Sequence, residues 1–344
     1  MKIIVTGGAG FIGSNTAKRF LEKGAKVVVF DNLSRRGAAE NLKWLETIGG
    51  DLNFVKGDIR NFHSLRALLE RHADVNYIIH LAGQVAVTTS VVNPREDFEV
   101  NAVGTFNVLE AVRSQGIKPL VLESSTNKVY GGMENVRVIE KTDGYAYQDF
   151  PQGIPESMNL DFHSPYGCSK GAADQYMHDY YRIYGIPTVV LRQSCIYGYR
   201  QFGIEDQGWV AWFLIAAVLG KPITIYGSGK QVRDVLFIED LVDLYEICYD
   251  KKDLCAGKIY NVGGGPKFTL SVWHQFGLMI EKLLDRKLKV QYSDWRPGDQ
   301  KIYVSDIRRI CNELGWTPGV SPEKGISLLY GWILENKEML RSLF

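Results

Sequence analysis

The chain has 344 residues, a net charge of +1 and five cysteines. This length allows a dinucleotide-binding unit with a smaller second region, and the near-neutral charge gives no basic patch for nucleic acid. The longest apolar run, residues 209–219, is too short for a membrane span and predicts a buried helix. Since a strand directly follows Met1 and the cysteines lack metal spacing, we expect a cytoplasmic protein with reduced thiols, no bound metal and no membrane segment.

The N-terminal pattern predicts a dinucleotide site. A strand over residues 2–6 leads into the loop GGAGFIG at residues 7–13, a helix over 14–23 and a second strand over 26–31. The glycines allow a tight turn and the close approach of a pyrophosphate to the helix N-terminus. Asp31 ends the second strand, where a carboxylate can bind the adenine ribose diol and repel a 2′-phosphate. Asp31 therefore favours NAD over NADP, whereas Arg35 and Arg36 either favour NADP or form a solvated loop.

Strand and helix patterns then alternate along the first half of the chain. This alternation predicts an α/β fold with a Rossmann-type, doubly wound parallel sheet and helices on both faces. Ligand-binding residues should lie at the carboxyl ends of its strands, as Asp58, Ala82 and residues 124–127 do. The predicted strands are 52–55, 75–80, 119–123 and 188–192, and the predicted helices are 64–71 and 101–115.

The second half is less regular and predicts a smaller, mixed α/β region interleaved with the first. A returning strand is expected at residues 259–262, and mostly helices after residue 267, around a turn at Arg296-Pro297-Gly298-Asp299. We therefore assign residues 1–198 and about 234–262 to an NAD-binding domain. Residues 199–233 and 263–344 form the predicted substrate-binding region.

Tyr166 and Lys170 are four residues apart, which places them on one face of a predicted helix. An ammonium beside a phenol favours the phenolate and lowers the pKa of the phenol. Tyr166 could then exchange a proton with a substrate hydroxyl near neutral pH, and the Thr126 hydroxyl could share that oxygen. With NAD as hydride acceptor, these groups predict the oxidation of an alcohol to a ketone.

Taken together, these residues resemble the extended short-chain dehydrogenase/reductase superfamily, the NAD-dependent epimerases and dehydratases of nucleotide sugars. The resemblance covers essentially the whole chain. Besides Thr126, Tyr166 and Lys170, it rests on GGAGFIG at 7–13, DI at 58–59, HLAG at 80–83, NAVGT at 101–105, VRD at 232–234 and RPGD at 296–299.

Longer strings resemble the CDP-paratose 2-epimerase (CDP-tyvelose 2-epimerase) group. They are SSTNKVYG at 124–131, LDFHSPYGCSKGAADQY at 160–176, RQF at 200–202 and DQGWV at 206–210. The resemblance implies NAD-dependent inversion at C2 of a nucleotide-linked hexose, with a CDP-linked sugar as substrate. It also implies a transient 2-keto sugar that is reduced again from its other face.

The resemblance implies a role for each candidate residue. Tyr166 is the base, Lys170 lowers the pKa of Tyr166 and contacts the nicotinamide ribose, and Thr126 hydrogen-bonds the reacting oxygen. Further NAD contacts are expected at Gly7, Gly10, Phe11, Ile12, Gly13, Asp31, Asn32, Asp58, Ile59, Leu81, Ala82, Gln84 and Asn101. Nucleotide-sugar contacts are expected at Asn127, His163, Gln207, Gly208, Trp209, Tyr226, Arg233 and Arg296, with the two arginines on the diphosphate.

Three other activities are weighed against this prediction. Related 4,6-dehydratases carry an Asp and a Glu directly after the active-site Thr, where this chain has Asn127 and Lys128, so dehydration is not expected. A UDP-sugar 4-epimerase of the UDP-glucose or UDP-glucuronate type stays open, weakly disfavoured by Val85. A non-catalytic NAD-binding sensor would usually lose the Tyr or the Lys that are retained here.

Several candidates also have a purely structural interpretation. His80 is expected to be a satisfied core residue, and Trp209 and Trp212 are expected to pack in the core rather than stack on a base. The helices near 101–115 and 169–184 are expected to pack on a second subunit in a homodimer or larger homo-oligomer, or within the subunit. Both interpretations stay open for Asn127 as a turn cap, His163 as a loop-ordering residue and Arg233 as a partner of Asp234 or Asp240.

Overall fold

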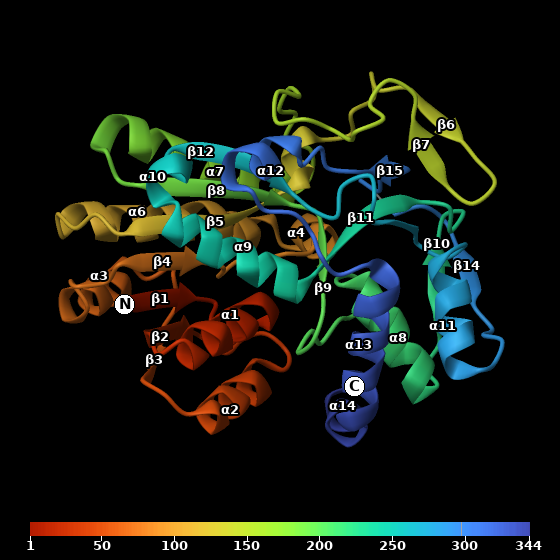
Figure 1. The fold of residues 1–344 in the computed structure, drawn as a ribbon, viewed down its shortest axis with the longest axis horizontal. Coiled ribbons are helices and arrows are strands. Elements are labelled where there is room, and N and C mark those ends of the chain that lie inside the picture. Colours follow the sequence, from red (N-terminus) through yellow and green to blue (C-terminus); the bar gives the residue numbers. More distant parts are fainter. Residues whose placement is uncertain (297) are drawn as a thin grey trace. The chain divides into compact units, whose positions relative to one another are not determined.

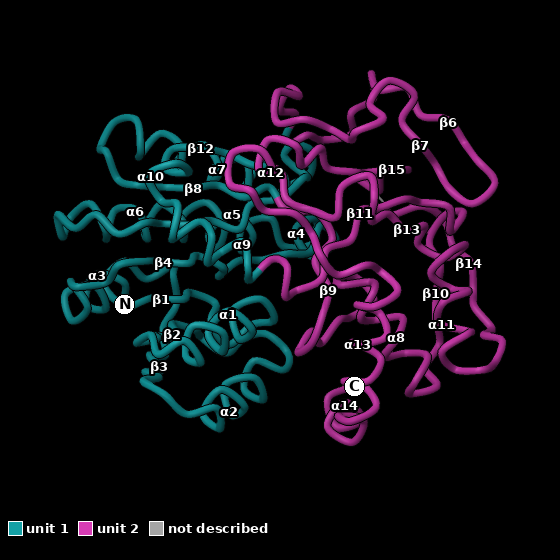
Figure 2. The backbone as a smooth tube through the Cα atoms, in the orientation of Figure 1, with its two compact units in different colours: residues 1–129, 162–192, 242–260 teal, residues 130–161, 193–241, 261–344 magenta. Residues whose placement is uncertain are grey.

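The computed structural model describes residues 1–296 and 298–344, which form two compact units (Figures 1 and 2). Unit 1 comprises residues 1–129, 162–192 and 242–260, and unit 2 comprises residues 130–161, 193–241 and 261–344. The two units are therefore interleaved in sequence. Their boundaries differ from the predicted domains, because residues 130–161, 193–198, 234–241 and 261–262 belong to unit 2. The assignment of NAD and substrate binding to these segments stays a prediction.

Unit 1 is built on a central sheet with the strand order β12-β8-β5-β4-β1-β2-β3. The pairings of β1 with β2 and β4, of β2 with β3, and of β4 with β5 are parallel. The order reverses between β1 and β4, and open α/β sheets bind ligands at the carboxyl ends of such strands. The predicted Rossmann-type sheet is thus confirmed. Its strands are β1 (Lys2–Thr6), β2 (Lys26–Asp31), β3 (Leu52–Lys56), β4 (Tyr77–His80), β5 (Leu120–Thr126), β8 (Thr188–Gln193) and β12 (Lys258–Val262).

Helices of unit 1 connect these strands (Figure 1). They are α1 (Phe11–Glu22), α2 (Ala38–Ile48), α3 (Phe62–Arg71), α4 (Val87–Val92), α5 (Pro94–Phe98), the π-helical segment η1 (Glu99–Val103), α6 (Gly104–Ser114), α7 (Ser164–Tyr184), α9 (Ile238–Asp250) and α10 (Lys252–Cys255). The first four residues of α9, 238–241, belong to unit 2, and the rest of this helix belongs to unit 1.

Both faces of the sheet are buried. Successive side chains along a strand point to opposite faces, and in these strands both sets are apolar. On β4, Ile78 packs in a buried cluster with Ile4 and with residues of α3, α6 and α7. Its neighbour Tyr77 contacts Phe20 of α1 and Tyr249 of α9, with ring centroids 6.2 and 5.4 Å apart. Burial on two faces explains why these strands read as continuous apolar runs.

One helix begins earlier than the sequence predicts. The helix predicted to start at residue 101 is preceded by α5 and η1, whose helical backbone runs into α6. Helix α7 begins at Ser164, with Pro165 in its first turn, where a missing N–H costs no hydrogen bond. It ends at Gly185, whose φ of 61° is left-handed. Tyr166 and Lys170 therefore lie on the same helix, as predicted.

Unit 2 contains short strands and helices of mixed α/β type. Strand β11 pairs with β9, β13 and β15, β10 pairs with β14, and β6 pairs with β7. The all-apolar helix α8 has the bounds predicted from its sequence. The elements are η2 (Asn127–Tyr130, which starts in unit 1), β6 (Val138–Glu140), β7 (Tyr145–Tyr147), β9 (Cys195–Tyr197), α8 (Trp209–Leu219), β10 (Thr224–Tyr226), β11 (Val232–Phe237), β13 (Thr269–Ser271), α11 (Phe276–Leu284), β14 (Gln291–Ser293), β15 (Ile302–Tyr303), α12 (Arg308–Leu314), α13 (Pro322–Glu335) and α14 (Lys337–Leu343).

The expectation of mostly helices after residue 267 is incomplete, since β13, β14 and β15 also lie there. Strands of two or three residues are too short to show an alternating pattern. Within the described residues, none of the helices is both long and apolar enough to cross a membrane.

Candidate functional site

The glycine-rich segment at residues 7–13, which joins β1 to the first turn of α1, requires glycine at its first and last positions. Gly7 has a left-handed φ of 68°, and a Cβ added to it would lie 2.6 Å from the backbone N of Ala82. A Cβ on Gly13 would lie 2.2 Å from the carbonyl O of Gly7. Helix α1 follows with Gly10 as its N-cap, which offers no side chain to the first N–H groups. From Phe11 and Ile12 onward, these N–H groups suit an anion such as a pyrophosphate.

Asp31 ends β2 beside this loop, and backbone amides hold its carboxylate. Oδ2 accepts a hydrogen bond from the Ala9 N–H at 3.0 Å, and Oδ1 accepts one from the Leu33 N–H at 2.7 Å. Burial raises the pKa of Asp31, while these hydrogen bonds oppose the rise. A nearly buried carboxylate here suits the hydroxyls of a ribose, which donate hydrogen bonds, better than a phosphate, which would repel it. Arg35 and Arg36 are exposed in the following loop.

Three residues predicted to contact NAD lie after β2 and β3. Asn32 Nδ2 donates to Asp58 Oδ2 at 3.0 Å, and Ile59 is buried. Arg60 donates to both oxygens of Asp58, at 3.0 and 2.7 Å. The Arg60 hydrogen bonds are the main reason that the pKa of Asp58 is lowered to about 2. Asp58 is therefore ionised and engaged within the protein.

The segment after β4 is held by side chains that were predicted to bind the cofactor. Asn101 Oδ1 accepts from the Gln84 N–H at 2.9 Å, and Asn101 Nδ2 donates to the Gln84 carbonyl at 3.1 Å. Asn101 Nδ2 also lies 3.0 Å from Ser169 Oγ on α7. The side chains of Asn101 on η1 and Ser169 on α7 thus hold the segment around Gln84 in place. The backbone groups of Leu81 and Ala82 lie near Gly7.

His80 is confirmed as a satisfied core residue. Its side chain is buried, with Nδ1 2.6 Å from Thr6 Oγ1 and Nε2 3.0 Å from Thr105 Oγ1. Burial lowers the pKa of His80 to about 3, with a smaller effect from Lys170. The imidazole is therefore neutral at physiological pH.

The three predicted catalytic side chains lie together in unit 1. Thr126 is the last residue of β5, and Tyr166 and Lys170 are one turn apart on α7. Burial raises the pKa of Tyr166, whereas Lys170 and a hydrogen bond with Thr126 lower it. The ammonium thus acts in the predicted direction, but burial outweighs it and the net change is upward.

Lys170 has a partner that the sequence did not predict. Its Nζ donates to Glu123 Oε1 at 2.8 Å, and both side chains are buried. Although burial lowers the pKa of Lys170, Glu123 and Tyr166 raise it, and the net change is upward. The available signal was a glutamate at the end of an apolar strand, since glutamate is almost never fully buried unless it is paired.

The residues that follow Thr126 carry no carboxyl group. Thr126 Oγ1 donates to Asn127 Oδ1 at 3.3 Å and accepts from the Lys128 N–H at 3.2 Å. The Thr126 oxygen therefore stabilises the start of η2. Asn127 is nearly buried beside it, and its contact with the sugar stays a prediction.

His163 precedes α7 as its N-cap residue and makes no side-chain capping hydrogen bond. Its side chain is exposed. The next residue, Ser164, has a left-handed φ of 70°, so the chain turns sharply into the helix that carries Tyr166. Either role predicted for His163 is compatible with this position.

In unit 2, Tyr226 and Arg296 lie together. The Arg296 guanidinium carbon is 3.7 Å from the centre of the Tyr226 ring. Arg296 also donates to the Glu205 carbonyl at 3.1 Å through each terminal nitrogen and pairs with Asp206 at 3.3 Å. The Tyr226 hydroxyl donates to Glu205 Oε1 at 3.2 Å.

In the predicted turn at residues 296–299, the Asp299 N–H donates a hydrogen bond of 3.2 Å to the Arg296 carbonyl. Pro297 lies outside the described residues.

The candidates next to α8 have mainly structural contacts. Gln207 pairs through its backbone with Ile204, and Gly208 is the left-handed N-cap of α8 with φ 76°. Trp209 Nε1 lies 3.5 Å from Cys195 Sγ, and its ring makes edge contacts with two phenylalanines. These contacts favour core packing for Trp209.

Arg233 lies on β11, and its Nη1 donates to the Val232 carbonyl at 2.9 Å. The carboxylates considered as its partners are held by other groups. Asp234 accepts from the Gly265 N–H at 3.1 Å, and Asp240 accepts from the backbone of residues 319 and 320 at 2.9 and 3.0 Å. These contacts are compatible with a role of Arg233 in binding phosphate.

No group of three or more His, Cys, Asp or Glu side chains is placed to bind a metal in residues 1–296 and 298–344. The five cysteines are free thiols.

Comparison with known proteins gives one family and close relatives. The sequence model of the GDP-mannose 4,6 dehydratase family matches residues 4–329. The chain is 47% identical to CDP-paratose 2-epimerase of Salmonella typhi, over 96% of this chain and 99% of that protein.

Solved structures are similar over nearly the full length. One is a UDP-glucose 4-epimerase of Thermotoga maritima with UDP-glucose, at a TM-score of 0.83 and 29% identity, covering 98% of this chain and 100% of that one. Another is a dTDP-glucose 4,6-dehydratase of Streptomyces venezuelae with NAD, at a TM-score of 0.85 and 28% identity, covering 100% of both chains.

The position of Asp31 predicts the nucleotide that the purified protein retains. Asp31→Ala removes a charged acceptor of ribose hydrogen bonds, so NAD affinity should fall by about 10- to 100-fold. Mass spectrometry of nucleotides released by denaturation should find NAD in the wild type and less in the variant. Arg36→Ala, in the same exposed loop, is the control and should retain NAD. Wild-type protein that carries only NADP would contradict the role of Asp31.

Proposed function

The chain belongs to the GDP-mannose 4,6 dehydratase family of the extended short-chain dehydrogenase/reductase superfamily, and from this premise we propose that it inverts C2 of a CDP-linked hexose. It is an NAD-dependent enzyme of the nucleotide-sugar epimerase kind. The choice of C2 and of CDP is the proposal. The observation that carries it is the near-full-length similarity to CDP-paratose 2-epimerase. CDP-paratose and CDP-tyvelose are accordingly the proposed substrate pair.

The residues of unit 1 fit NAD. The glycine loop leaves no room for a Cβ at Gly7 or Gly13, the start of α1 presents N–H groups to a diphosphate, and Asp31 presents a carboxylate to a ribose. When bound, NAD supplies a reversible hydride acceptor for the sugar carbon. The chain itself supplies the proton transfer and the orientation of the sugar.

Tyr166 takes the proton of the C2 hydroxyl as the alcohol becomes a ketone and returns it when the ketone is reduced from its other face. Thr126 hydrogen-bonds the same oxygen and thereby orients it. Lys170 favours the phenolate form of Tyr166, which burial alone would disfavour. Both directions of proton transfer require Tyr166 to be accessible as phenol and as phenolate.

Asn127 and Lys128, the two residues that follow Thr126, favour epimerisation over dehydration. Loss of water from a keto sugar requires an acid for the leaving hydroxyl and a base for the neighbouring proton. Asn127 cannot titrate, and Lys128 is a poor substitute for a carboxylate base. The 2-keto sugar is therefore expected to be reduced rather than dehydrated.

The remaining candidates are proposed to hold the nucleotide sugar. Arg233 and Arg296 suit its diphosphate, and Asn127 and His163 suit the sugar. Gln207, Gly208, Trp209 and Tyr226 stay predicted contacts of the nucleotide sugar, although the packing of Trp209 favours a structural role. Exposed aromatic residues on α6 and α7, among them Phe106 and Tyr176, support the expected homodimer.

Tyr166→Phe tests the proposed base. It removes the titrating hydroxyl with little change of shape, so turnover should fall by about two orders of magnitude or more. NAD content and thermal stability should stay near those of the wild type. The matched control is Tyr181→Phe, at another exposed tyrosine of the same helix, which should keep full activity. A Tyr166→Phe enzyme with nearly wild-type turnover would require another base.

The substrate is tested by incubation with CDP-, UDP- and GDP-linked hexoses, followed by NMR of the products. The proposal expects inversion of a CDP-linked sugar at C2, with CDP-paratose converted into CDP-tyvelose or the reverse. Inversion of a UDP-sugar at C4 would instead make the chain a 4-epimerase. Absence of any conversion, with NAD bound, would favour a non-catalytic NAD sensor.

A further inference from the structure

The proposed function gives no role to Glu123, a buried carboxylate of the catalytic region. It lies on β5, three residues before Thr126, and is fully buried. Its Oε1 accepts the hydrogen bond from Lys170 at 2.8 Å, while its Oε2 has no hydrogen-bond partner within the described residues. A buried carboxylate beside the catalytic lysine needs an explanation, because desolvating both charges is costly.

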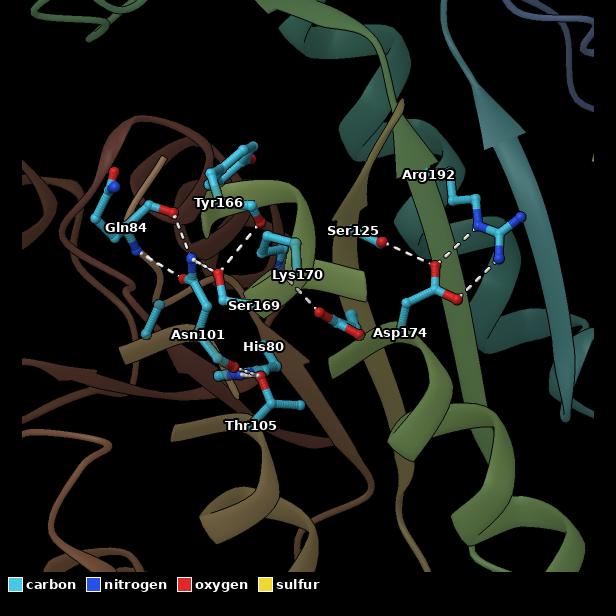
Figure 3. A network of polar contacts seen from close by, with 12 residues as sticks. His80, Gln84, Asn101, Thr105, Ser125, Tyr166, Ser169, Lys170, Asp174 and Arg192 are labelled. Carbon is cyan, nitrogen blue, oxygen red and sulfur yellow. Dashed lines mark hydrogen bonds and ion pairs between the residues drawn. The ribbon is translucent and has the colours of Figure 1, made fainter. Parts of the chain in front are cut away.

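The surrounding charges leave Glu123 and Lys170 as partners of each other. Asp174, one turn after Lys170 on α7, accepts two hydrogen bonds from Arg192 of β8, at 2.8 and 2.9 Å, and one from Ser125 at 2.9 Å. Asp174 is therefore already compensated (Figure 3). Among the described residues, other titratable groups near Tyr166 and Lys170 include His80 on β4, which is neutral, and Asp97 on α5, which accepts hydrogen bonds from Ser169 and Gln84.

We propose that Glu123 is a positioning residue for proton transfer, which holds the Lys170 ammonium beside Tyr166 and offsets its charge. The proposal rests on the proposed function of Tyr166 as base and acid. It adds a residue that touches neither the substrate nor the cofactor and acts through Lys170.

The physical reason is that Tyr166 has to give its proton back. A lone ammonium in a buried, low-dielectric site would strongly stabilise the phenolate, and a phenolate that is too stable is a poor acid partner. A carboxylate on the far side of the ammonium weakens this effect. Accordingly, Glu123 and Asp97 raise the pKa of Tyr166, in addition to the main effect of burial, whereas Lys170 and Thr126 lower it.

The hydrogen bond also sets the position of Lys170. A lysine side chain has many rotamers, and its ammonium would otherwise search several of them. Anchoring one N–H on Glu123 leaves the other two available to Tyr166 and to a ribose hydroxyl. Position and charge are therefore controlled by the same contact.

The test is an ultraviolet titration of the Tyr166 phenolate, obtained as the difference between each protein and its Tyr166→Phe counterpart. Glu123→Gln keeps the size and one acceptor but removes the charge. We expect its Tyr166 pKa to be lower by about one, so that the phenolate fraction at a fixed pH below the pKa is about tenfold higher. The acidic limb of kcat/KM against pH should move to lower pH by the same amount.

Ser125→Ala is the matched control. It lies on the same face of β5 and removes a buried hydrogen bond to Asp174 without touching Lys170. It should leave the Tyr166 titration unchanged. If Glu123→Gln and Ser125→Ala behave alike, or if the glutamine variant raises or does not move the pKa of Tyr166, the proposal is wrong and Glu123 only stabilises the fold.

Two features keep the test decisive. The titration needs no substrate, so it stays valid even if the enzyme does not invert C2, and the two proposals fail separately. If Glu123→Gln does not fold, a crystal structure of the wild-type protein replaces it. Lys170 Nζ within hydrogen-bond distance of a Glu123 oxygen would support the proposal, and a Lys170 side chain directed away from Glu123 would overturn it.

Discussion

Helix α7 is joined to the sheet of unit 1 by side chains spaced four residues apart, and the arrangement of the catalytic groups depends on this stripe. Lys170 pairs with Glu123 of β5, and Asp174 pairs with Arg192 of β8. All four side chains are buried, so breaking either pair leaves an uncompensated charge at a cost of about 3–5 kcal/mol. The same face carries Tyr166 one turn earlier. The charged stripe thereby fixes the rotation of α7 that brings Tyr166 to the end of β5.

The chemistry of Tyr166 results from two opposing effects in this setting. Burial disfavours the phenolate, and the ammonium of Lys170 favours it. The balance matters for an epimerase, because its tyrosine has to accept a proton and release it within one turnover. A reaction that used the tyrosine only as a base would gain from a lone ammonium. The carboxylate of Glu123 therefore suits a tyrosine that both accepts and releases a proton better than a tyrosine that acts only as a base.

Much of unit 1 could be predicted from sequence because its signals are local. A glycine loop between a strand and a helix, the acid Asp31 at the end of the next strand, and the spacing of Tyr166 and Lys170 all follow from short-range geometry. Glu123 and the hydrogen bonds of Asn101 could not be assigned, since they depend on which helix packs on which strand. The π-helical register at Asn101 and the short strands of unit 2 lack a periodic pattern. The net pKa of Tyr166 was also beyond the sequence, because it depends on burial.

The central claim, transient oxidation at C2 within one closed site, is tested most directly with a CDP-hexose deuterated at C2. The account predicts a primary isotope effect on turnover and complete retention of deuterium at C2 of the inverted product, observed by NMR and mass spectrometry. A substrate deuterated at C4 serves as the control and should show neither slowing nor any change at C4. Loss of the C2 deuterium to solvent would contradict the account, because it would show deprotonation beside a carbonyl group instead of hydride transfer.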